Sequence, residues 1–117
     1  MKRSMLVLIL VAAACRTATL PDHNPYVARA DAAQAGEKLF RAHCAECHGA
    51  GGNGGAHAPS LRSQYVASKS DRALFHFITN GNLRHGMPSW SRLSDDRRWQ
   101  IVTYLRSLQP VVTGVNF

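Results

Sequence analysis

The sequence predicts a small all-α domain. Apolar side chains recur at helical spacing in three stretches, within residues 36–47, 74–78 and 101–108. No alternating strand pattern flanks the cysteine pair in the first of these stretches. Between the first two stretches, residues 49–58 hold five glycines, too many for a helix or a strand, so the chain must turn tightly there. The domain is therefore expected to consist of helices joined by long loops.

The N-terminal stretch has the pattern of an export signal. It has a basic start at Lys2 and Arg3, an apolar run from Met5 to Val11, and then three alanines. At roughly 10 residues, the apolar part is too short for a comfortable transmembrane helix. We expect residues 1–14 to be a signal peptide and the rest of the chain to be exported to the periplasmic side of a membrane.

Cys15 directly follows these alanines, and this position resembles that of the lipidated first residue in bacterial lipoproteins. Ala12 stands where the lipoprotein motif usually has leucine. Ordinary cleavage after Ala14 or Ala30, or retention as an uncleaved anchor, are the alternatives. Residues 15–30 contain two prolines and no periodic pattern of apolar residues, which predicts a flexible tether. This tether would attach the domain to the membrane through Cys15.

The first domain helix is expected to begin near Asp31, because a carboxylate suits the positive end of a helix dipole. Gly36, Phe40, Cys44 and Cys47 follow at spacings of four, four and three, so they share one helix face. Glycine inside a helix costs about 1 kcal/mol relative to alanine. We therefore expect a structural reason for the presence of a glycine at position 36.

The run CAECH at residues 44–48 places two thiols three positions apart, with an imidazole directly after the second. Covalent haem attachment requires this arrangement, because each cysteine can add to one vinyl group and the histidine can reach the iron. A redox-active dithiol would need a βαβ context, and a zinc site about four ligands. The remaining cysteine, Cys15, is far upstream. We predict one haem c, bound covalently through Cys44 and Cys47, with His48 as an iron ligand.

Two shorter helices are expected after the glycine run. One ends at Ser68, and the next runs from Ser70 and Asp71 to a stop at Asn80 and Gly81. His76 lies on the second helix, where a surface or packed role is expected rather than iron binding.

Met87 is the only methionine left once the signal is removed, and it lies in a Gly-Met-Pro-Ser-Trp run within the loop 82–93. This polar loop has no helical stripe that a core methionine would join, so Met87 is our second candidate iron ligand. His85 is the alternative, whereas His43 and His57 are less suitably placed. Trp90 either packs over a haem edge or closes the loop.

The last helix has the clearest signals. Ser94 is a good N-cap, acidic residues occupy the first turn, and an apolar stripe follows, formed by Ile101, Tyr104, Leu105 and Leu108. Residues 110–117 are expected to be a frayed C-terminal tail.

Together these motifs resemble a class I (mitochondrial-type) cytochrome c over residues 31–109. The resemblance is carried by AAQAGEKLFRAHCAECHG, by APSL at 58–61, by GMPSW at 86–90 and by IVTYLRSL at 101–108. It implies the small cytochrome c fold, in which the N- and C-terminal helices cross over a covalently bound haem.

The resemblance also implies roles for individual residues. Gly36 and Phe40 would pack against Ile101 and Tyr104. The carbonyl of Pro59 would bind the far nitrogen of the proximal histidine, His48, and so fix its ring. Leu61 would pack on the haem, and Met87 would be the axial ligand opposite His48.

The charge of the chain is +7, and loss of Lys2 and Arg3 leaves 12 Lys+Arg against 7 Asp+Glu, or +5. The basic residues are scattered singly, without the runs or aromatic interleaving of a nucleic-acid binder, so no nucleic-acid partner is expected. They favour redox partners with an acidic docking surface.

The expected function is electron transfer by a monohaem carrier that is not an enzyme. One alternative is a haem subunit fixed in a dehydrogenase or oxidase complex, which would share every motif. The other is a gas-binding or peroxidase haem protein, which would require that Met87 be absent from the iron or labile.

Overall fold

The structure is a computed structural model that describes residues 23–110. Our predictions for the signal peptide 1–14, for Cys15 and for the tail beyond Pro110 lie outside these residues. The described chain forms helices α1 (Ala30–His43), α2 (Ala45–His48), α3 (Gln64–Ala67), α4 (Asp71–Asn80) and α5 (Asp95–Ser107), with a 3-10 turn η1 (Leu83–His85). Its only strand-like pairing is one isolated bridge between Asn82 and Met87, so the all-α prediction is confirmed. None of these helices is long and apolar enough to cross a membrane.

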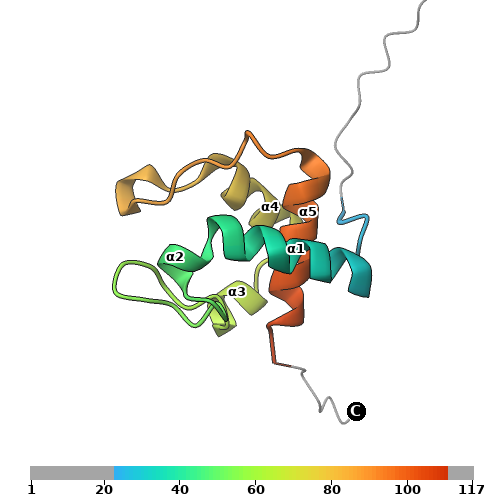
Figure 1. Ribbon diagram of the computed structural model, residues 1–117, viewed down its shortest axis with the longest axis horizontal. Helices are drawn as coiled ribbons and strands as arrows, with labels where there is room; N and C mark the ends of the chain where they lie inside the picture. Colours follow the sequence, from blue (N-terminus) through green and yellow to red (C-terminus); the bar gives the residue numbers. More distant parts are fainter. Residues whose placement is uncertain (1–22, 111–117) are drawn as a thin grey trace, which may run out of the picture.

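Helices α1 and α5 cross at the centre of the domain, as Figure 1 shows. Gly36 lies at this crossing: a Cβ atom there would lie 1.9 Å from the carbonyl oxygen of Gln100 and 2.9 Å from Cβ of Tyr104. The lack of a side chain is therefore what allows the two backbones to approach. One turn further along α1, the ring of Phe40 is fully buried, 5.3 Å from that of Tyr104.

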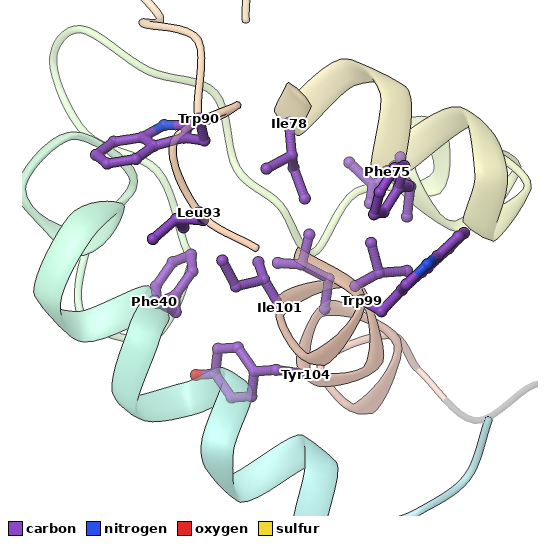
Figure 2. Packing of buried hydrophobic residues seen from close by; sticks show 12 residues of the cluster. Phe40, Phe75, Ile78, Trp90, Leu93, Trp99, Ile101 and Tyr104 are labelled. Atoms are coloured by element: carbon purple, nitrogen blue, oxygen red, sulfur yellow. The ribbon is translucent and has the colours of Figure 1, made fainter. Parts of the chain in front are cut away.

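The hydrophobic core extends from this crossing towards α4 (Figure 2). Phe75 of α4 stacks on Trp99 of α5 with ring centroids 4.1 Å apart. Burying such aromatic side chains supplies much of the stabilisation of a small domain. The other buried apolar residues of this cluster come from α1, α3, α4, the following loop and α5: Phe40, Val66, Leu74, Ile78, Trp90, Leu93, Ile101, Val102, Tyr104 and Leu105.

Serine side chains cap the N-termini of three of the helices. Ser63, Ser70 and Ser94 each accept a hydrogen bond from a backbone N–H in the first turn of the helix that follows. These bonds satisfy amides that have no partner within the helix. The starts predicted at Ser70 and Ser94 are confirmed, as is the stop of α4 at Asn80 and Gly81.

Residues 23–29 differ from the tether that the sequence predicts up to residue 30. Asn24 is 5% exposed, and its side-chain amide donates to Asp71 Oδ2 and Thr103 Oγ1, both at 3.0 Å. The hydroxyl of Tyr26 donates to Asp96 Oδ1 at 2.8 Å, and this bond raises the pKa of Tyr26. Polar side chains attach this segment to α4 and α5. The tether was predicted from the spacing of apolar residues, which carries no information about polar contacts.

Candidate functional site

The CAECH run occupies the sharp turn where α1 ends and α2 begins. Cys44 is the residue between the two helices, and its N–H donates to the carbonyl of Phe40 at 2.8 Å. Cys44 is half-buried and Cys47 is exposed, and neither forms a disulfide bond within the described residues. Burial raises the pKa of Cys44 to about 11, with a further contribution from Cys47.

His48 has a defined ring orientation. Its Nδ1 lies 3.0 Å from the carbonyl oxygen of Pro59. Since a carbonyl oxygen only accepts, Nδ1 must carry the proton in this hydrogen bond, which leaves the lone pair on Nε2. Metal-binding histidines are commonly held this way, with the second nitrogen donating to a carbonyl group.

The glycine-rich loop brings Pro59 to this position. The N–H of Gly54 donates to the carbonyl of His48 at 2.7 Å, and the N–H of Leu61 donates to that of Gly52 at 2.7 Å. The loop therefore folds back on α2, with Pro59 between these two attachments. Leu61 is half-buried against the core.

Met87 lies two residues after η1, where the chain turns back. It is half-buried against the core, and its backbone pairs with Asn82 through hydrogen bonds of 2.8 and 3.0 Å. The alternative ligand, His85, is exposed, with Nδ1 3.0 Å from Asn82 Oδ1. Of the other histidines, His57 and His76 are exposed.

Trp90 connects the Met87 loop to the end of α1, a contact that the sequence alone did not reveal. Its ring is 8% exposed and lies 5.0 Å from that of His43, the residue before Cys44. The guanidinium of Arg92 lies 4.4 Å from the same ring. Trp90 thus closes the loop on the turn that carries the cysteines.

These residues fit a covalently bound haem. Two thiols lie on one short turn, and the neighbouring imidazole has its metal-binding nitrogen free of the Pro59 contact. Cys44, Leu61 and Met87, from three different segments, pack against one buried cluster. A small all-α domain with this arrangement of residues is typical of proteins that bind a c-type haem.

Comparison with known proteins identifies the family. Residues 31–105 match the family described as "Cytochrome C oxidase, cbb3-type, subunit III". The chain is 31% identical to cytochrome c6 of Cyanidium caldarium over 87 residues, which cover 72% of this chain and 78% of that protein. The chain therefore belongs to the cytochrome c family, with a c-type haem bound covalently through Cys44 and Cys47.

A solved structure confirms the fold. Cytochrome cL from the marine methylotrophic bacterium Methylophaga aminisulfidivorans MPT resembles this chain with a TM-score of 0.64 and 31% sequence identity. The match covers 73% of this chain but 58% of that one, so this chain spans little more than half the length of that relative. The small cytochrome c fold follows from this likeness, and haem-based electron transfer follows from the family.

Proposed function

We propose that this protein is a monohaem electron carrier whose iron has His48 and Met87 as axial ligands. The observation that carries the proposal is the 3.0 Å contact between His48 Nδ1 and the Pro59 carbonyl, which leaves Nε2 for a metal. Met87 is the only methionine of the described residues. Its backbone pairs with Asn82, and Trp90, three residues further on, donates to the Ile78 carbonyl of α4. His85 is the weaker candidate because its side chain is exposed, whereas Met87 is half-buried against the core.

The bound haem supplies one-electron chemistry between ferric and ferrous iron. Pro59 holds the imidazole in one tautomer and orientation, which strengthens His48 as a donor. The soft thioether of Met87 favours the ferrous state and therefore raises the reduction potential. With His48 and Met87 both bound to the iron, no site would remain there for a substrate, which is why we propose a carrier and not an enzyme.

A second candidate function is that of a haem subunit fixed in an oxidase or dehydrogenase complex. The description of the matching family as an oxidase subunit favours it. Purification from native membranes distinguishes the two, because a fixed subunit would co-purify in constant ratio with larger chains.

The docking surface for a redox partner is proposed to lie on the Met87 loop. Residues 81–93 contain Arg84 and Arg92 and no acidic residue, and both arginines are exposed. Leu83, next to Arg84, is 77% exposed. An apolar residue beside unopposed positive charge suits a partner with an acidic surface, because complementary charges accelerate encounter.

Charge reversal at Arg84 tests both the electron transfer and this surface. In Arg84→Glu, oxidation of the ferrous protein by anionic ferricyanide should slow by roughly 3- to 10-fold at low salt, and oxidation by a cationic cobalt complex should accelerate. Lys38→Glu, at an exposed position of α1, is the matched control and should change both rates less. Equal changes in the two variants would argue against a docking surface on the loop.

Export and membrane attachment complete the proposal. The signal pattern of residues 1–14 and the position of Cys15 support a lipid anchor on the periplasmic side. Native protein should then begin at Cys15, carry acyl mass and partition into detergent, whereas Cys15→Ser should yield soluble cytochrome. An unmodified Cys15, or a native N-terminus at Asp31, would contradict the anchor.

A further inference from the structure

The loop that carries Met87 is closed by a pair of backbone hydrogen bonds and is attached to the C-terminal end of α4 after the methionine. Up to the methionine, the loop is closed by backbone hydrogen bonds of 2.8 and 3.0 Å that Asn82 and Met87 exchange. After it, Ser89 Oγ donates to the carbonyl of Thr79 at 2.6 Å, and Trp90 N donates to that of Ile78 at 3.1 Å. These carbonyls belong to the last turn of α4, where helix geometry leaves acceptors without internal partners.

Gly81, the first residue after α4, lies where the loop returns. Its backbone has φ +67° and ψ −168°, a conformation that is essentially restricted to glycine. A Cβ atom at Gly81 would lie 2.5 Å from both the carbonyl carbon and oxygen of Pro88, and 2.7 Å from the carbonyl oxygen of Met87. All three are backbone atoms, which cannot move aside by a side-chain rotation. The backbone at Met87 and Pro88 therefore lies directly against the α carbon of Gly81.

We propose that Gly81 is a positioning residue for Met87. Its missing side chain lets the backbone of Met87 and Pro88 lie against the end of α4, and this contact sets where the thioether is held. The inference rests on the proposed axial role of Met87. According to this inference, contact with the end of α4 is what positions Met87. The rest of the loop therefore need not be rigid.

Gly86 provides a matched comparison within the same loop. It also has a positive φ, +83°, but with ψ 6° it lies in the ordinary left-handed region. A Cβ atom at Gly86 would meet nothing within 4 Å. Alanine at Gly86 therefore introduces backbone strain alone, whereas alanine at Gly81 adds a collision with the backbone that holds Met87.

The experiment compares Gly81→Ala with Gly86→Ala in the haem-loaded protein. Two readouts report the iron–thioether bond: the weak long-wavelength absorption band of the ferric protein, and the rate of carbon monoxide binding to the ferrous protein. Gly81→Ala should lose most of the band and bind carbon monoxide roughly tenfold faster or more, whereas Gly86→Ala should keep most of the band. Equal retention of the band in the two variants would overturn the inference.

Met87→Ala, measured alongside, separates this inference from the proposed ligation. If Met87→Ala leaves both readouts unchanged, the axial role of Met87 fails. If it removes the band while Gly81→Ala does not, only the positioning role fails.

Hydrogen exchange in the unmutated protein provides a test that does not depend on folding of the Gly81 variant. If the loop is held against the end of α4, the amide of Trp90, which donates to the Ile78 carbonyl of α4, should exchange at least roughly tenfold more slowly than the Arg84 amide of the exposed turn. Similar exchange rates for the Trp90 and Arg84 amides would overturn the inference.

Discussion

Replacing Met87 by alanine is expected to open the iron to external ligands. The ferrous Met87→Ala protein should bind carbon monoxide with an affinity raised by more than roughly tenfold, because no thioether has to be displaced first. Reactivity with peroxide should appear for the same reason. The reduction potential should fall by on the order of 100 mV, since the soft ligand that favours ferrous iron is lost.

His85→Ala is the control for this experiment. His85 lies two residues before Met87 and is exposed, so its removal should leave the carbon monoxide affinity and the potential nearly unchanged. The reverse pattern, with large changes in His85→Ala and none in Met87→Ala, would assign the sixth position to His85 instead.

Gly36→Ala is expected to destabilise the domain strongly. The added methyl group would lie 1.9 Å from the carbonyl oxygen of Gln100, so α1 and α5 would have to separate. Overpacking of a core typically costs about 1–3 kcal/mol, and a collision with backbone should reach the upper end or exceed it. For a domain of this size, the midpoint of thermal unfolding should fall by roughly 10 °C or more.

The sign of the effect makes this a decisive test. If Gly36 faced solvent, alanine would stabilise α1 by about 1 kcal/mol through its higher helix propensity. Thermal unfolding of the holoprotein, followed by circular dichroism, distinguishes the two outcomes. Ala42→Gly, the opposite change at an exposed position of the same helix, should cost only about 1 kcal/mol and serves as the control.

The features that the sequence predicted correctly are those set by local chemistry. Ser70 and Ser94 fix helix starts through hydrogen bonds to amides three residues away. The stop of α4 at Gly81 and the cysteine pair at 44 and 47 are equally local signals. The crossing at Gly36 is a long-range contact. A glycine inside a helix only indicated that some reason exists for it, and the partner residues were predicted from the resemblance to class I cytochromes c.

The features that the sequence did not reveal depend on contacts between different segments of the chain. Asn24 pairs with Thr103, 79 positions away, so the domain begins earlier than its apolar pattern indicates. The contact of Trp90 with His43 and the close approach of Pro88 to Gly81 likewise join segments whose adjacency only the folded chain defines. Spacing rules describe one helix or strand at a time, which is why these three contacts were missed.

Carbon monoxide binding to the unmutated ferrous protein at neutral pH tests the proposed carrier function most directly. With His48 and Met87 both bound to the iron, the purified holoprotein should bind the gas poorly and slowly, because the thioether must first leave. Rapid, tight binding by the unmutated protein would contradict the six-coordinate electron carrier and favour a gas-binding or peroxidase function instead.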